Sequence, residues 1–190
     1  SQLAKENKKF LYQTIKEGAR AREYENALNW LNDANLLYKI YNVTKTDFPL
    51  VAYNDLSSFK IYMNDVGLLR NMANLDSKIV VEGDKLFEEF KGAFTENYVL
   101  NMLNVILNKV PNYFTFDRNE INFIIQYKNK IIPIEVKSNK STNNISLTKY
   151  NKKYNNNLSI RFSMNNLVKD DNIINIPLFM IEYMDKLIEN

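Results

Sequence analysis

The chain of 190 residues contains no cysteine and no histidine. The absence of cysteine excludes disulfides, structural zinc held by thiolates, and cysteine nucleophiles. The absence of histidine excludes Ser-His-Asp triads and metals bound by imidazole. Any chemistry must therefore come from carboxylates, amines, guanidinium groups or hydroxyls. The metal that suits such a set best is a hard cation with oxygen ligands, such as Mg²⁺.

Long apolar runs are also missing. No segment approaches the ~20 apolar residues that a membrane-spanning helix needs, and no signal peptide opens the chain. These absences predict a cytoplasmic protein without membrane insertion. The composition is ordinary for a globular protein, with 45% hydrophobic and 25% charged residues. A net charge of +3 is compatible with nucleic-acid contact but does not by itself predict it.

Residues 120–138 carry the most informative pattern in the chain. Apolar and polar residues alternate on both sides of a polar turn at Lys128-Asn129, which predicts a hairpin of two half-buried strands. Side chains of alternate residues share one face of a strand. The predicted apolar face holds Ile121, Phe123, Ile125, Tyr127, Ile132, Ile134 and Val136.

The other face of this hairpin is expected to carry a polar cluster. The register set by the short turn places Asn122 opposite Glu135 and Glu120 opposite Lys137. Cross-strand Cβ atoms in such pairs lie roughly 5 Å apart. The cluster of two acids, an amide and an amine is the sharpest functional indication in the sequence.

A helix predicted over about residues 90–108 adds another carboxylate. Helical spacing puts Glu96 on an apolar stripe with Leu100, Leu103 and Leu107. A carboxylate on such a stripe is costly unless it is paired or binds a metal. The alternative is a frayed helix end that lets Glu96 reach water.

The first part of the chain, residues 1–57, is predicted to form a winged-helix-like segment. The pattern indicates two helices followed by a hairpin, which is the layout of that DNA-binding fold. The alternative is a small helical subdomain whose basic residues are merely solvated. The predicted helices cover residues 3–16 and 22–34, the predicted strands cover 36–44 and 50–53, and the candidate phosphate contacts are Arg20, Arg22, Lys39 and Lys45.

The sequence Glu135-Val136-Lys137 places an acid and an amine on one face of a strand. Metal-dependent phosphodiesterases use such a pair together with acids from a neighbouring strand and a helix. The carboxylates hold a cation that activates a water molecule, and the lysine orients that water or stabilises developing charge. Taken alone, the pattern is equally typical of a surface ion pair.

Four segments of the chain resemble an uncharacterised domain family that follows an AAA-type ATPase module in many bacterial and archaeal proteins. The resemblance implies an α+β chain in which the winged-helix segment of residues 1–57 precedes a PD-(D/E)xK nuclease-like domain of residues 58–190. It also implies an ATPase module N-terminal to Ser1. No Walker motif is present, so this chain is not expected to hydrolyse ATP. The segments that carry the resemblance are residues 65–69, 90–99, 120–123 and 132–138.

By position in this family, Glu96, Glu135 and Lys137 match the catalytic helix acid, strand acid and lysine. The implied Mg²⁺ ligands are Glu96, Asn122 and Glu135. Asn122 stands where the family usually has Asp, and an amide lacks the negative charge that gives a hard cation most of its affinity. We therefore expect weak or absent cleavage, and a role in nucleic-acid binding or in regulation of the ATPase. The alternatives are an active Mg²⁺-dependent DNA nuclease and a protein-interaction module.

Overall fold

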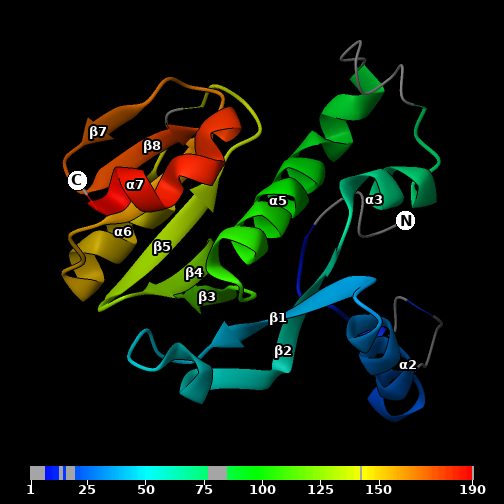
Figure 1. Ribbon diagram of the computed structural model, residues 1–190. Helices are drawn as coiled ribbons and strands as arrows, with labels where there is room; N and C mark the ends of the chain where they lie inside the picture. The colour runs from blue at the N-terminus through cyan, green and yellow to red at the C-terminus, as the bar shows by residue number, and fades with distance from the viewer. Residues whose placement is uncertain (1–6, 13–14, 16–19, 77–84, 142, 190) are drawn as a thin grey trace.

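The computed structural model describes residues 7–12, 15, 20–76, 85–141 and 143–189, with only the backbone described at 21, 22 and 85–89. Its centre is one mixed, 8-stranded sheet with the order β2-β1-β3-β4-β5-β6-β8-β7 (Figure 1). Helices flank the sheet, so the expected α+β class is confirmed. The strands are β1 (Leu37–Val43), β2 (Asn54–Met63), β3 (Asn112–Phe116), β4 (Asn119–Tyr127), β5 (Lys130–Val136), β6 (Ser159–Ser163), β7 (Val168–Asp170) and β8 (Ile173–Pro177). The described helices are α2 (Ala21–Asp33), α3 (Val66–Met72), α5 (Lys85–Leu107), α6 (Ile145–Tyr154) and α7 (Met184–Glu189), with the 3-10 helices η2 (Leu50–Tyr53) and η3 (Leu178–Tyr183).

Two helical layers cover opposite faces of the central strands (Figure 1). On one face α5, η3 and α7 pack on the sheet, and the resulting core includes Leu100, Leu103, Phe123, Ile134 and Met184. On the other face α6 and η2 form a second core, which includes Leu50, Phe114, Ile121, Ile124 and Leu147. A third core joins α2 and α3 to β1, β2 and the first half of α5, and it includes Leu28, Phe59, Ile61, Leu69 and Phe94.

The hairpin predicted within residues 120–138 is confirmed as β4 and β5. The strands are antiparallel, and Tyr127 pairs with Lys130 across a two-residue turn. Lys128 takes a positive φ of 52° in this turn. The register continues to the pair Phe123 and Ile134, which is the predicted alignment of the two strands.

The predicted face of Ile121 is wrong. Between the pairs Asn112–Ile124 and Phe114–Ile121, β4 contains one residue more than β3. Such a bulge breaks the alternation of side chains along a strand. Ile121 therefore packs with Ile124 under α6, whereas Phe123 packs under α5.

The N-terminal part of the chain differs from the expected hairpin. The strand predicted at residues 50–53 is wrong, because these residues form η2. β1 pairs with β2 on one side and, in parallel, with β3 on the other, so both strands belong to the central sheet. β2 runs without interruption through the boundary predicted between residues 57 and 58. Most of the helix predicted over residues 3–16 lies outside the described residues, and residues 7–11 are not helical.

Helix α5 confirms the predicted apolar stripe. Leu100 and Leu103 are completely buried, and Leu107 packs at the edge of the same core. The acid Glu96 lies one turn before Leu100, so the helix presents it where β2 and β4 approach. Position and burial of α5 therefore decide the geometry of the candidate site.

Replacement of Leu103 by Ala tests how far the sheet depends on this helix. The buried side chain leaves a cavity, and we expect the free energy of unfolding to fall by ~2–5 kcal/mol. Val105, on the same helix, is 75% exposed, so Val105→Ala should change it by no more than about 0.5 kcal/mol. Urea denaturation of both variants measures the difference, and equal effects would contradict this packing.

Candidate functional site

An asparagine fixes α5 against the end of β2. Asn97 is 1% exposed, and its side-chain amide makes hydrogen bonds in both directions with the backbone of Met63. The N–H of Met63 donates to Asn97 Oδ1 at 2.9 Å, and Asn97 Nδ2 donates to the Met63 carbonyl at 2.8 Å. The neighbouring residue Glu96 is thereby held next to β2.

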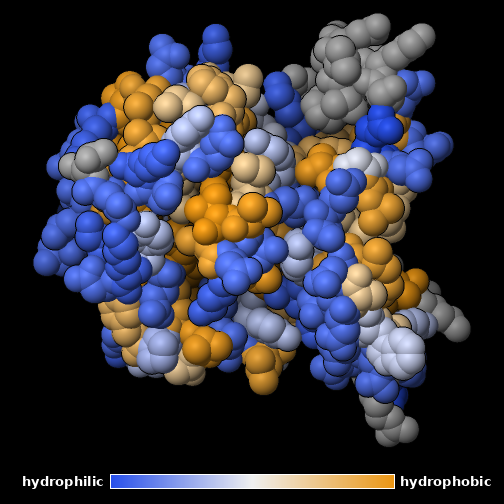
Figure 2. Space-filling view, in the orientation of Figure 1, coloured by the Kyte–Doolittle hydropathy of each residue, from blue (hydrophilic) through white to orange (hydrophobic). Residues whose placement is uncertain are grey.

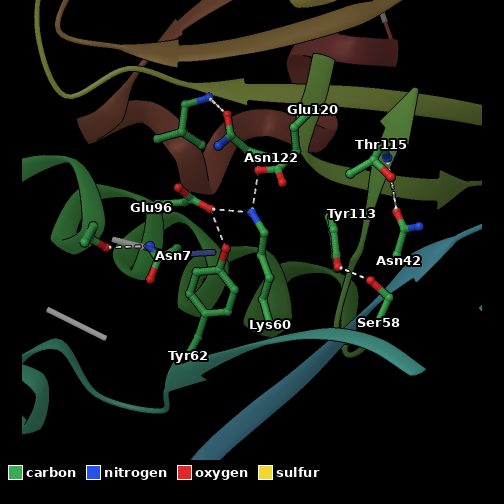
Figure 3. A network of polar contacts seen from close by, with 12 residues as sticks. Asn7, Asn42, Ser58, Lys60, Tyr62, Glu96, Tyr113, Thr115, Glu120 and Asn122 are labelled. Atoms are coloured by element: carbon green, nitrogen blue, oxygen red, sulfur yellow. Dashed lines mark hydrogen bonds and ion pairs between the residues drawn. The ribbon is translucent and has the colours of Figure 1, made fainter. Parts of the chain in front are cut away.

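A buried lysine lies at the centre of the polar network in Figure 3. Lys60, on β2, is 0% exposed. Its Nζ lies 2.5 Å from Glu120 Oε1 and 3.8 Å from Glu96 Oε1. The ammonium also lies 4.9 Å from the centre of the Tyr113 ring, a distance typical of a cation–π contact. Acids from α5 and β4 therefore converge on one cation supplied by β2.

Glu96 has a second partner on the same strand as the lysine. The hydroxyl of Tyr62 donates a short hydrogen bond to Glu96 Oε1. Burial raises the pKa of Glu96 above its usual value, while the Lys60 charge and the Tyr62 hydrogen bond oppose that rise. Burial, together with the Glu96 charge, raises the pKa of Tyr62 well above its ordinary value. Tyr62 thus stays a proton donor throughout the physiological pH range.

Glu120 reaches the lysine because of the bulge in β4. An unbroken strand would put Glu120 on the same face as Ile124, under α6. Instead Glu120 pairs with Lys60, on the side where Tyr62 contacts Phe123 with ring centres 5.8 Å apart. The Glu120 side chain is 41% exposed, so the ion pair opens to solvent on this side.

Glu135 and Lys137 form a separate ion pair at the end of β5. Lys137 Nζ donates to Glu135 Oε1 at 2.6 Å. The expected pairing of Lys137 with Glu120 is thus replaced by pairing within its own strand. Glu135 is only 7% exposed, and its Oε2 has no hydrogen-bond partner among the described residues. Burial raises the pKa of Glu135, and the hydrogen bond from Lys137 opposes that rise.

Asn122 performs a backbone role. Its Oδ1 accepts a hydrogen bond of 3.0 Å from the N–H of Val136, at the end of the hairpin where regular pairing between β4 and β5 has stopped. The amide thereby replaces a missing ladder bond. Its oxygen is directed at β5 and already accepts one donor, which reduces its capacity to bind a cation.

The predicted Mg²⁺ ligands have different partners within the chain. In the part of the chain that the structure describes, no group of three or more acids could hold a metal ion. Glu96 contacts Lys60 and Tyr62, while Glu135 contacts Lys137. One oxygen of each acid already has a donor or an ammonium of the chain beside it, while Glu135 Oε2 has no partner among the described residues. Mg²⁺ binding by Glu96, Asn122 and Glu135 stays a prediction.

Two of the predicted phosphate contacts already have partners within the chain. Lys45 forms an exposed ion pair of 2.6 Å with Asp47. Lys39 donates to Asn29 Oδ1 at 3.2 Å and lies over the Phe59 ring at 4.6 Å. Arg20 is exposed just before α2, and the side chain of Arg22 lies outside the described residues. DNA contact by these four residues stays a prediction.

The motifs of the sequence did not single out Lys60 and Tyr62. The signal was available: in Phe59-Lys60-Ile61-Tyr62-Met63, large apolar residues stand on one face, and the lysine and tyrosine share the other. Every residue of this run is buried. A lysine in a strand buried on both faces needs an acidic partner, but the sequence does not say which acid.

Two family models match the chain. The Domain of unknown function (DUF8612) matches residues 1–79, and the Domain of unknown function (DUF4143) matches residues 91–180. Each model covers less than half of the chain. The second match contains Glu96, Glu120 and Glu135, while Lys60 lies within the first. The site therefore combines residues from both matched regions. Searches of curated proteins and of solved structures found no match.

The described helices were also compared with what a membrane-spanning helix requires. None of them combines the length and the apolar character needed to span a bilayer. The longest, α5, carries Glu96 and Asn97 in its middle and is covered by the sheet on one side.

Replacement of Glu96 by Gln tests the burial of its charge. Because the folded state raises the pKa of Glu96 above 4.5, the unfolded chain loses this proton at lower pH than the folded one. The wild type should therefore lose stability relative to Glu96→Gln as the pH rises from about 4.5 through the raised pKa. The loss is ~1.4 kcal/mol for each unit by which the pKa is raised.

Denaturation of both proteins across this pH range measures the effect. Glu189→Gln is the control, because Glu189 is an exposed acid whose pKa is lowered by Lys128 and Tyr127. Its pH dependence should have the opposite sign. A constant difference between the wild type and Glu96→Gln would contradict a buried, charge-destabilised Glu96.

Proposed function

We propose that residues 85–163 form a PD-(D/E)xK nuclease-like fold that binds nucleic acid without efficient cleavage. The order of elements supports this: α5 precedes the antiparallel strands β3, β4 and β5, and α6 then leads to β6, which is parallel to β5. Acids stand at the positions expected for such a fold, on α5 and at the end of β5. In the resemblance noted above, these positions belong to the catalytic residues.

The observation that carries the loss of cleavage is the state of the acids. Glu120 and Glu96 surround Lys60, and Glu135 is bound by Lys137. A hydrolytic metal needs carboxylates that are free to bind it and to lower the pKa of its water. Here two internal ammonium groups already pair with these three carboxylates, which leaves the acids less free to bind a metal ion.

Lysines around the open end of the hairpin support nucleic-acid binding. Lys137 lies at this end, Lys140 is exposed in the following loop, and Lys149 is exposed on α6. Lys149 donates to Asn119 Oδ1 at 3.2 Å, which places it beside the start of β4. Amines grouped around one end of a fold attract phosphates and make binding strongly dependent on salt.

An AAA-type ATPase module is the proposed partner in the same polypeptide. The match of residues 91–180 to the Domain of unknown function (DUF4143) supports this, since that domain is commonly found at the C-terminal end of AAA-ATPase proteins. A winged helix is not part of this function, because β1 and β2 continue the central sheet. A role of Arg20 and Arg22 in DNA contact remains compatible with it.

Binding and cleavage can be measured with the same labelled DNA. We expect fluorescence anisotropy to show salt-dependent binding of single-stranded or duplex DNA, equal in Mg²⁺ and in EDTA. Lys149→Glu should weaken it and reduce the slope against salt by ~0.7–0.9 for the lost phosphate contact, because fewer counterions are released. Lys140→Glu should act in the same direction.

Lys128→Glu is the matched control, since it makes the same charge change at the far end of the hairpin, where Lys128 pairs with Glu189. It should leave the affinity nearly unchanged. If the Lys128 and Lys149 variants weakened binding equally, the affinity would come from the overall charge of the protein and not from a defined binding surface. Mg²⁺-dependent cleavage that is lost in Lys137→Ala would overturn the proposed loss of catalysis, and absence of DNA binding would favour a protein-interaction module.

A further inference from the structure

Lys60 is completely buried, and its ammonium is paired with acids of the chain. A buried ammonium is costly, because desolvation takes away its strong hydration. The structure compensates this cost with Glu120 at 2.5 Å, Glu96 at 3.8 Å and the Tyr113 ring at 4.9 Å. These partners mark a cation position that four elements of the fold, β2, β3, β4 and α5, build together.

Two carboxylates from different elements converge there, which is the arrangement that oxygen-binding cations use. Here the charge is covalently attached to β2, and the ammonium fills the space between the two acids (Figure 3). A divalent ion cannot enter this position unless the lysine side chain leaves it.

We propose that the Lys60 ammonium is the resident cation of the Glu96–Glu120 pair and takes the place of a divalent metal ion. The one ammonium is paired with both acids, so the ion pairs hold the shape of the site without metal. The proposal has a consequence for variants that lack the lysine charge. In such a variant the two carboxylates face each other, and their oxygen atoms are available to a cation, so a metal site should appear. This inference concerns the cation alone and stands whether or not the chain binds nucleic acid.

The Tyr62 hydroxyl supports this assignment. It donates to the same Glu96 oxygen that faces Lys60, so one carboxylate oxygen receives both a proton donor and a positive charge. Tyr62 is itself buried and packs on Phe123, which prevents the donor from turning away.

Titration with Mn²⁺ tests the inference first in the unaltered chain. We expect no saturable binding by calorimetry or electron paramagnetic resonance, and no shift of the melting temperature with Mn²⁺ or EDTA. Saturable binding to the wild type that disappears in Glu120→Gln would overturn the inference, because Mn²⁺ and the ammonium would then compete for the same carboxylates.

The second arm uses Lys60→Met, which shortens the unbranched side chain by one atom and removes its charge. We expect a lower melting temperature and a new, saturable Mn²⁺ site that raises it again. The double variant Lys60→Met/Glu120→Gln should lose this response, since one acid of the pair is then neutral. A folded Lys60→Met protein that Mn²⁺ neither binds nor stabilises would contradict the inference.

DNA binding measured on the same proteins separates this inference from the proposed function. Loss of DNA binding in the wild type would remove the proposed function and leave the cation assignment intact. Conversely, Mn²⁺ binding by the wild type that requires Glu120 would contradict the role of Lys60 as the resident cation. The DNA-binding result would still test the proposed function.

Discussion

The ion pairs of the buried Lys60 set a constraint that much of the remaining structure satisfies. An unpaired ammonium in the interior would cost several kcal/mol, so β2 can be buried on both faces only if acids reach this point. Asn97 holds α5 against Met63 and thereby delivers Glu96. The bulge in β4 turns Glu120 to the same side. The register of α5, β2 and β4 is thus coupled through one charged group.

Local periodicity was sufficient to predict the elements around the site. The alternation along residues 120–138 predicted β4, β5 and the turn at Lys128, and the stripe through Leu100 and Leu103 predicted α5. Side chains in these elements repeat with a fixed period, so their pattern can be read without knowledge of their partners. The position of Glu96 on the buried side of α5 followed from the same reasoning.

The partners of the acids could not be predicted in this way. Lys60 and Glu120 are separated by 60 positions in the chain, and no periodic pattern encodes a contact between such distant residues. The bulge in β4 also cannot be recognised in the sequence of β4 alone, because the extra residue is identified only by comparison with the paired strand β3. It is this bulge that exchanged the expected partner of Glu120, Lys137, for Lys60. With that exchange the acids face an ammonium of the chain itself, where the sequence had led us to expect a metal ion.

The central claim is that an ammonium, and not a metal ion, occupies the space between Glu96 and Glu120. Anomalous diffraction from crystals soaked in Mn²⁺ tests it most directly, because it locates the ion and the lysine in the same experiment. The account predicts no anomalous peak between these two carboxylates, with Lys60 Nζ ordered there. A manganese peak between them, with the Lys60 side chain displaced, would contradict it.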